Sequence, residues 1–340
     1  MKSKARDKIL MSSLYSSLGG SHKVMHEASL VLKQEGFNVD CRGFTDFSDS
    51  VPLRGFSHNS QGLLFSNVAS MVLILIQEFL YCIRHRPKYI YVHDIMSFYA
   101  YVPCMLLGCK IIRHVHSFSS SNIKESIREY LSYRNIYINE NQYKDSARKK
   151  VNFLIENPVI LNVRNLNSCE DYIVCPASYD EKNKQNDRIF ELSKLLHKER
   201  FICCGSILDE KFYFKMKSFE DHQVTIYGPK SQQFIYSRAK AVVSFSKYET
   251  FGLTMAESLL IGIPFFSLKN DAYIRMAERV GYPIERVSFN CVNEMAKYIG
   301  SLDYSDTIKE EFTVKIKENF GSEIFKYKLI KLFSGLCHAK

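Results

Sequence analysis

The sequence lacks tryptophan, and it also lacks several patterns that would define a class of protein. None of its ten cysteines forms a Cys-x-x-Cys pair, which disfavours zinc-finger and dithiol redox motifs. We expect most of these cysteines to be small buried side chains in a reducing compartment. No Gly-x-Gly-x-x-Gly follows the first predicted strand, which disfavours an NAD-dependent oxidoreductase.

Long apolar runs are missing as well. The most apolar segment, residues 68–82, contains Gln77 and Glu78 and stops short of the roughly 20 residues that a membrane span needs. The basic start, residues 1–17, has too short an apolar stretch for a signal peptide. The sequence therefore predicts a cytoplasmic protein, and a peripheral contact with the cytoplasmic face of the membrane stays open.

Acidic residues are fewer than basic ones, and the formal net charge is +10. Such an excess favours an anionic partner, either a nucleotide phosphate or a lipid surface, although a solvated basic surface would look the same. The basic residues are dispersed and carry no aromatic-rich RNA-binding signature, so we do not expect nucleic acid to bind.

The order of the predicted elements indicates two α/β domains in the 340 residues. Strands alternate with helices in both halves, which predicts two doubly wound, Rossmann-like domains that face each other across a cleft. The predicted strands cover 8–14, 37–44, 89–93, 110–114, 172–176, 200–204, 223–227, 241–245 and 264–268. The predicted helices include 68–85, 97–107, most of 119–150 and the tail after 304. We place the domains at 1–160 and 161–318, with a C-terminal helix, 319–340, packing back toward the first.

The most informative stretch is 241–268, which reads AVVSFSKYETFGLTMAESLLIGIPFFSL. It predicts a strand, a loop carrying Glu249, a helix over about 252–261 and a further strand. A helix that starts at Gly252 turns free backbone N–H groups toward the ligand edge of the sheet, where phosphate binds well. Glu249 and Glu257 flank this anion site, which makes electrostatic sense if the two carboxylates bind hydroxyl groups beside the phosphates.

This pattern resembles the signature of the retaining glycosyltransferases of the GT-B fold, particularly family 4, which includes bacterial polysaccharide and O-antigen enzymes. The resemblance rests on ETFGLTMAESLLIGIP over 249–264, preceded by the strand AVVSFS. It implies transfer of a sugar, as in a hexosyltransferase, from a nucleoside diphosphate sugar with retention of configuration. It also implies that neither a cofactor nor a metal is needed, and no Asp-x-Asp motif that would bind one is present.

Other segments agree with the resemblance. The pair Gly19-Gly20 is similar to the family's N-terminal glycine loop, and the turn at Gly228 is similar to one near the base-binding pocket, although each could be a plain turn. The strand 89–94, YIYVHD, resembles one that lines the cleft. In 110–118, KIIRHVHSF, the second histidine, His116, matches the position next to the reacting sugar; we expect His114 to be a core histidine.

The resemblance assigns the site residue by residue. The catalytic residues it implies are His116, Glu249 and Lys184. The donor-binding residues it implies are Gly19, Gly20, Lys184, Gly228, Glu249, Phe251, Gly252, Leu253, Thr254 and Glu257. Lys182 competes with Lys184 for the diphosphate position.

Two features depart from the family pattern. The arginine that precedes the diphosphate lysine has no counterpart, and 269–272, Lys-Asn-Asp-Ala, stands where glycines usually approach the donor. These departures leave a non-catalytic nucleotide-sugar-binding subunit as an alternative. A GT-B-fold epimerase or phosphorylase is a second one. We expect a glycan or lipid-linked acceptor at the basic, tyrosine-rich segment 117–150, together with Arg113, although this segment could equally be a solvated helix face.

Overall fold

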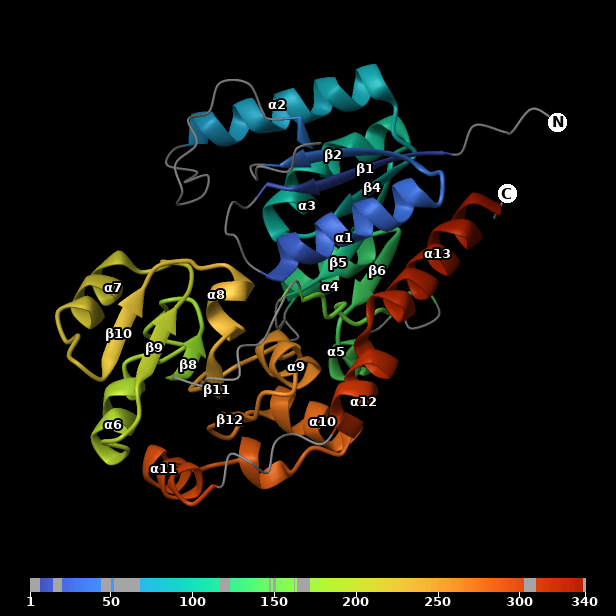
Figure 1. Cartoon of the computed structure of the whole chain (residues 1–340). Helices are drawn as coiled ribbons and strands as arrows, with labels where there is room; N and C mark the ends of the chain where they lie inside the picture. Colours follow the sequence, from blue (N-terminus) through green and yellow to red (C-terminus); the bar gives the residue numbers. More distant parts are fainter. Residues whose placement is uncertain are drawn as a thin grey trace. The chain divides into compact units, whose positions relative to one another are not determined.

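The computed structural model of the chain contains two compact units (Figure 1). It describes residues 7–14, 20–43, 50–51, 68–116, 123–146, 148, 151–161, 163, 172–302 and 310–338. Unit 1 comprises Met1–Asn157 and Glu323–Lys340, and unit 2 comprises Pro158–Ser322. Each unit is a parallel sheet with helices between its strands, so the α/β fold expected from the sequence is confirmed.

Unit 1 contains a seven-stranded sheet in the order β3-β2-β1-β4-β5-β6-β7, and its neighbouring strands all run parallel. Its strands are β1 (Lys8–Ser13), β2 (Asn38–Gly43), β3 (Ser50–Val51), β4 (Tyr89–Val92), β5 (Lys110–Val115), β6 (Arg134–Tyr137) and β7 (Phe153–Leu154). Its helices are α1 (Gly20–Gln34), α2 (Val68–His85), α3 (Ile95–Tyr101), the 3-10 helix η1 (Val102–Leu107), α4 (Ile123–Leu131), α5 (Glu140–Asp145) and α13 (Ser322–His338).

Successive residues of a strand point to opposite sides of the sheet, and the central strands are apolar at successive positions. Both faces of this sheet are therefore apolar, as is usual for a parallel sheet covered by helices. On β4, Tyr89 and Tyr91 face a core shared with α1 and α13, whereas Ile90 and Val92 face a core shared with α2 and α3. The C-terminal helix α13 closes the first core, and the Tyr89 hydroxyl donates a hydrogen bond of 2.8 Å to the Leu336 carbonyl. The last segment of the chain is therefore part of unit 1.

A buried ion pair explains the glutamate inside the apolar helix α2. Glu78 has no exposed surface, and its carboxylate accepts hydrogen bonds of 2.8 and 2.7 Å from the Arg42 guanidinium on β2. The Tyr101 hydroxyl also donates to this carboxylate. Such a two-pronged pair satisfies both charges, so α2 tolerates the charge on its buried face.

Two expectations for unit 1 are wrong in part. The helix predicted over 97–107 is α-helical only to Tyr101 and continues as η1, because Pro103 has no N–H group to extend the α-helical pattern. The segment 119–150, expected to be mostly helical, contains strand β6. Buried Asn135 on that strand accepts a hydrogen bond of 2.9 Å from the side chain of Arg113 and donates one of 3.2 Å to Asn152, so polar residues satisfy one another inside the sheet.

Unit 2 repeats the same winding in a five-stranded parallel sheet of order β10-β9-β8-β11-β12. Its strands are β8 (Tyr172–Pro176), β9 (Phe201–Cys204), β10 (Val224–Tyr227), β11 (Ala239–Ser244) and β12 (Phe265–Ser267). Its helices are α6 (Arg188–Leu195), α7 (Glu210–Lys217), α8 (Gln232–Tyr236), α9 (Leu253–Leu260), α10 (Asp271–Val280), the 3-10 helix η2 (Ile284–Val287), α11 (Val292–Gly300) and α12 (Glu310–Phe320).

Most of the described cysteines are buried, as expected. Of the cysteines whose state is described, Cys41, Cys82, Cys104, Cys109, Cys175, Cys203 and Cys204 are buried thiols and Cys291 is exposed. Cys203 and Cys175 lie in the core of unit 2 beside large aromatic side chains such as Phe201.

Candidate functional site

The topology marks one place in each sheet where a ligand is expected. In a doubly wound sheet, ligands bind beyond the carboxyl ends of the strands, where the strand order reverses. In unit 1 this reversal lies between β1 and β4, and in unit 2 it lies between β8 and β11. The loops that follow these four strands therefore carry the candidate site residues.

In unit 2, the loop after β8 is fastened to the loop after β11 by Asn183. The Asn183 side chain accepts a hydrogen bond of 3.0 Å from the backbone N–H of Tyr248 and donates one of 3.2 Å to the carbonyl of the same residue. Its own carbonyl accepts a bond of 2.9 Å from the N–H of Lys247. These three bonds hold the two loops in register at the reversal point.

This register brings Lys184 and Glu249 together. The Lys184 ammonium forms an ion pair with Glu249 Oε1, and both side chains are about one-fifth exposed. Lys182, the competing lysine, is exposed instead. Tyr273 Oη lies 3.4 Å from the same carboxylate oxygen, and burial together with the charge of Glu249 holds the pKa of Tyr273 well above its usual value. Tyr273 therefore stays neutral and remains a hydrogen-bond donor.

The helix predicted to start at Gly252 begins at Leu253, with Gly252 as its N-terminal cap. Gly252 has φ of 92°, which other residues rarely adopt, and a Cβ there would lie 3.0 Å from the ring of Tyr273. No side chain caps the first turn of α9, and Leu253 and Thr254 are half-buried. The backbone N–H groups of this turn can therefore serve an anion.

Glu257 lies one turn further along α9 and is buried. Its carboxylate accepts hydrogen bonds of 2.8 Å from Gln232 Nε2 and 2.7 Å from the Tyr236 hydroxyl, both on α8. Burial and the neighbouring Glu257 carboxylate raise the pKa of Tyr236 well above its usual value, so this phenol stays a donor. Two neutral donors thus fix the position of the carboxylate.

Two further residues of the expected donor site have plain structural surroundings. Phe251 is buried and packs edge-on against Phe320 of α12, with ring centroids 5.2 Å apart. Gly228 follows β10, and a Cβ there would meet only the side chain of Ile207 at 3.8 Å, an ordinary contact. By contrast, a Cβ at Gly205 would lie 2.1 Å from the carbonyl oxygen of Ala177, so only glycine lets the end of β9 approach the loop after β8.

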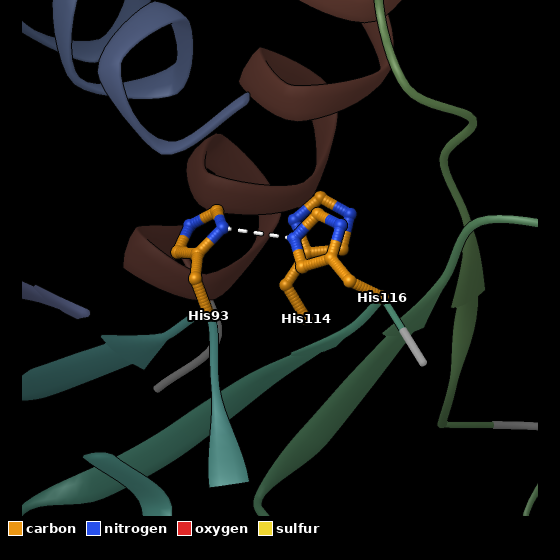
Figure 2. A group of neighbouring side chains, drawn as sticks. All are labelled: His93, His114 and His116. Atoms are coloured by element: carbon orange, nitrogen blue, oxygen red, sulfur yellow. Dashed lines mark hydrogen bonds between the residues drawn. The ribbon is translucent and has the colours of Figure 1, made fainter. Parts of the chain in front are cut away.

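Unit 1 presents histidines at its reversal point (Figure 2). His93 directly follows β4, His114 lies on β5, and His116 directly follows β5. His93 Nδ1 and His116 Nε2 are joined by a hydrogen bond of 3.0 Å, and the ring centroids of His114 and His116 lie 4.2 Å apart. His114 is buried, as expected of a core histidine, and it also lies beside His116, because residues two apart on a strand point to the same face.

The glycine loop is described only in part. Gly19 lies outside the described residues, and Gly20 is the first residue of α1. Close to it, His22 Nε2 lies 3.0 Å from Ser13 Oγ at the end of β1. Asp94 caps the start of α3 and accepts a hydrogen bond of 2.9 Å from the N–H of Leu14, which joins the loops after β1 and β4.

Several basic side chains of the segment expected to bind the acceptor instead form ion pairs and hydrogen bonds within unit 1. Arg113 and Arg128 both pair with Glu125. Arg148 donates hydrogen bonds to the carbonyls of Glu129, Tyr130 and Ser132. These positive groups are thus committed to structure, while the Lys144–Glu140 pair is exposed.

Sequence reasoning missed the neighbours that hold the site together. Tyr273, Gln232 and Tyr236 contact Glu249 or Glu257 through side-chain hydrogen bonds, and Asn183 bonds Tyr248, the residue before Glu249. They lie 21 to 65 residues away from their partners. Asn183 had one available signal, since it adjoins Lys184 in a loop that follows a buried strand.

The two parallel sheets with their interleaved helices have the fold of the GT-B glycosyltransferases, and solved structures agree. A glycosyltransferase from Rickettsia africae ESF-5 matches with a TM-score of 0.75 at 14% identity, over 99% of this chain and 100% of that chain. HepE from Anabaena, in complex with UDP and glucose, gives 0.74 at 14% identity over 97% and 100%. Sucrose-phosphate synthase from Thermosynechococcus elongatus gives 0.74 at 14% identity over 98% and 100%.

No protein-family model matches the chain, and no curated protein matches it either. Among the described residues, no helix combines the length and the apolar character that crossing a membrane requires.

Proposed function

We propose that this chain is a glycosyltransferase that moves a sugar from a nucleoside diphosphate sugar to a glycan or lipid-linked glycan. The observation that carries the proposal is the arrangement at the carboxyl edge of unit 2. There a lysine, an uncapped helix start and two carboxylates held by partners come from loops and helices around one reversal point. The fold alone would not decide the activity, because one fold supports many chemistries. The structure of HepE with UDP and glucose adds support.

Each group meets a different part of such a donor. The Lys184 ammonium and the first N–H groups of α9 would bind the diphosphate and stabilise the charge that develops as it leaves. Glu249 would accept hydrogen bonds from the sugar hydroxyls, and Glu257 from the vicinal hydroxyls of the ribose. Carboxylates accept such bonds strongly, and neutral donors hold Glu257 in place.

We further propose that transfer proceeds with retention, without a metal ion at the diphosphate. The fixed positive groups, Lys184 and the α9 N–H groups, would supply the charge that a metal supplies elsewhere. An oxygen of the leaving diphosphate would take the proton of the acceptor hydroxyl. His116 would contact the transferring sugar, as the resemblance implies.

For the acceptor we propose a lipid-linked glycan at the cytoplasmic face of a bacterial membrane, in surface polysaccharide synthesis. Apolar side chains exposed on one face of α2 support this: Val72, Leu73, Ile76, Leu80 and Ile83. With the excess positive charge of the chain, they suit an anionic lipid surface. Ile76→Asp should weaken binding to anionic phospholipid vesicles, whereas Val314→Asp, on exposed α12, should not; equal effects would contradict the lipid contact.

One observation favours a second function, a nucleotide-sugar-binding subunit without catalysis. Asn270 stands where the family has glycine; it caps α10 and donates a hydrogen bond of 2.9 Å to the carbonyl of Ser246. The asparagine side chain occupies space that a glycine at this position would leave open for the donor. Such a subunit would bind the donor and neither transfer nor hydrolyse it.

The test is a panel of nucleotide-sugars, read by thermal stability and by slow donor hydrolysis, on wild type and Glu257→Gln. A donor at a hundred times its dissociation constant stabilises the folded state by about 2.7 kcal/mol. We expect one donor to stabilise and hydrolyse, and the variant to lose both effects. Stabilisation with no turnover, even with glycan acceptors, would favour the binding subunit. No stabilisation by any donor would overturn the assignment of the site.

A further inference from the structure

The strand register of unit 1 gathers three imidazoles on one face of the sheet. Strands β4 and β5 pair with Tyr91 beside Ile112 and Val92 beside Arg113, so the next pair is His93 beside His114. His116 lies two residues further on and points to the same face as His114. Figure 2 shows the three rings together above the strand ends.

The nitrogens of this cluster are poorly satisfied. His93 and His114 are buried, and three buried nitrogens have no hydrogen-bond partner among the described residues: His93 Nε2, His114 Nε2 and His116 Nδ1. An unpaired polar atom in a protein interior destabilises the folded state, because it has lost its hydrogen bonds to water. Three such atoms in one place therefore indicate a ligand that the three rings share.

The chemistry of the cluster narrows the ligand to an electron-pair acceptor. Each ring has one buried nitrogen without a described partner, and such a nitrogen can offer a lone pair. Neutral imidazole, with a lone pair on one nitrogen, is the form of histidine that binds metal ions. The three ligand atoms, one from each ring, lie within 4.8 Å of one another.

We propose that His93, His114 and His116 form a binding site for one divalent transition-metal ion, with Zn²⁺ as the best match. A set of imidazoles suits Zn²⁺, Ni²⁺ and Cu²⁺ rather than Mg²⁺ or Ca²⁺, which prefer oxygen ligands. Three protein ligands leave a fourth tetrahedral position for water.

The geometry needs only a small adjustment. Tetrahedral Zn²⁺ with Zn–N bonds of about 2.0–2.1 Å sets its nitrogens about 3.4 Å apart. The rings must therefore turn slightly inward from their present spacing. The metal would replace the hydrogen bond between His93 Nδ1 and His116 Nε2, or would use the nitrogens that have no partner.

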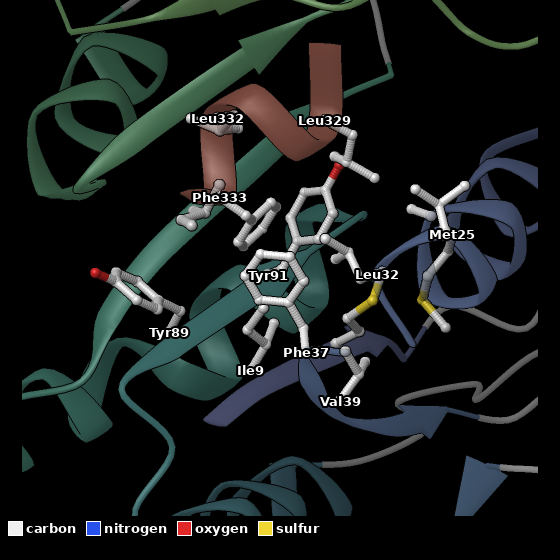
Figure 3. Close-up of a cluster of buried hydrophobic side chains, with 14 of the residues drawn as sticks. Ile9, Met25, Leu32, Phe37, Val39, Tyr89, Tyr91, Leu329, Leu332 and Phe333 are labelled. Atoms are coloured by element: carbon white, nitrogen blue, oxygen red, sulfur yellow. The ribbon is translucent and has the colours of Figure 1, made fainter. Parts of the chain in front are cut away.

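An outer partner for one ligand is already present. The Tyr91 hydroxyl lies 2.7 Å from His114 Nδ1 (Figure 3 shows Tyr91 in the core with Phe333 of α13). If Nδ1 donates to this hydroxyl, Nε2 carries the lone pair and can bind the ion. Metal-binding histidines commonly have such a partner on the second nitrogen, which fixes the ring and its tautomer.

The site gives His116 two competing roles. A bound ion would occupy a ring that the proposed transferase uses to contact the sugar, so Zn²⁺ should slow transfer. Binding itself is measurable without any activity, and the metal proposal therefore stands or falls separately from the transferase proposal.

The test is a titration of the full, untagged chain with Co²⁺ and Zn²⁺. We expect one Co²⁺ per chain with the intense visible absorption of four-coordinate cobalt, displaced by Zn²⁺. His93→Gln, His114→Gln and His116→Gln should each abolish this absorption, and His222→Gln, which alters an exposed histidine of unit 2, should leave it unchanged. No absorption in wild type, or absorption that survives all three variants, would overturn the proposal.

A milder variant and a direct measurement on the wild type distinguish loss of the metal site from misfolding of the histidine variants. Tyr91→Phe keeps the buried ring but removes the partner of His114, and it should weaken metal binding about 10-fold to 100-fold. X-ray absorption on the Zn²⁺-loaded wild type should show three imidazole ligands. Fewer than two imidazoles, or unchanged affinity in Tyr91→Phe, would contradict the assigned geometry.

Discussion

The two sheets share one winding, but the carboxyl edges of their strands differ in how the polar groups are satisfied. At the edge of unit 2, Lys184, Glu249 and Glu257 pair with one another or with neutral donors. At the edge of unit 1, three imidazoles meet with nitrogens that no described group satisfies. The first edge has a partner for each charged side chain and suits a ligand with both phosphates and hydroxyls. The edge of unit 1 has imidazole nitrogens that can donate lone pairs and suits a metal ion. We therefore expect the two edges to bind ligands of different chemistry.

The largest effect should come from a polar cluster in unit 1 that is fully paired. Glu78→Ala leaves the Arg42 guanidinium buried without its partner, and the free energy of unfolding should fall by about 3–5 kcal/mol. Chemical denaturation measures it. Glu140→Ala, which removes an exposed pair with Lys144, should change stability by less than about 0.5 kcal/mol. Similar losses in both variants would show that burial and pairing do not set these contributions.

At the edge of unit 2, the proposed roles of the charged groups can be separated. Glu249→Gln should lower the rate of transfer by about 10²–10³-fold, because an electrostatic contact made at the reacting sugar is lost. The affinity for the nucleoside diphosphate alone should stay within a few-fold. The control is Glu199→Gln, whose ion pair with Lys240 lies at the opposite edge of the same sheet. A rate loss in the control as large as in Glu249→Gln would contradict the assignment.

A smaller effect is expected where a residue positions the site without touching the donor. Asn183→Ala removes the side-chain bonds to Tyr248 and should lower stability by about 1–3 kcal/mol. It should also lower kcat about 10-fold, because misplacement of Lys184 slows the chemical step. Asn183→Asp keeps the acceptor oxygen and should restore part of the rate. The control is Asn290→Ala, at an exposed position just before α11. If aspartate restores none of the rate and Asn290→Ala is equally harmful, the effect of Asn183→Ala is a general loss of structure.

The smallest effect concerns the pH dependence of unit 1. Burial alone would raise the pKa of Glu125, but hydrogen bonds and charges from Arg113 and Arg128 outweigh it and lower this pKa below 4.5. The stabilisation is therefore complete above the unfolded-state pKa of about 4.3 and is lost as the pH falls through the lower folded-state pKa.

Stability measured between pH 6 and pH 3 should consequently fall less in Glu125→Gln than in wild type. The difference should be the size expected for a partly buried pair, about 0.2–1 kcal/mol. Glu278→Gln, at an exposed position of α10, should leave the curve unchanged. A steeper curve in Glu125→Gln would reverse the sign of the assigned shift.

Regular apolar patterns made much of the fold predictable. The helix expected over 68–85 coincides with α2, which is an apolar run of helix length, and the strand expected over 172–176 coincides with β8, which is almost fully buried. Strand β6 was missed because its sequence, Arg-Asn-Ile-Tyr, carries polar groups, and distant residues such as Arg113 and Asn152 satisfy the buried Asn135. A single sequence does not show such distant partners.

The candidate site was predictable where function depends on a local pattern. Glu249, Gly252 and Glu257 share one strand-loop-helix segment, so their spacing carries the signal. The choice between Lys182 and Lys184 depended on Asn183 bonding a loop 65 residues away. The histidine cluster depended on the register between β4 and β5. Neither can be read from spacing along the chain.

The most direct test of the account is the affinity of a nucleoside diphosphate for two matched lysine variants, measured by calorimetry. Lys184 and Lys240 each pair with a glutamate in unit 2, at similar burial and at opposite edges of one sheet. The account predicts that Lys184→Met weakens binding of UDP, or of the diphosphate of the identified donor, at least about 10-fold, since a hydrogen bond to a charged group contributes about 1.5–3 kcal/mol. Lys240→Met should bind as wild type does. Equal affinities in the two variants would contradict a donor site at the carboxyl edge of unit 2.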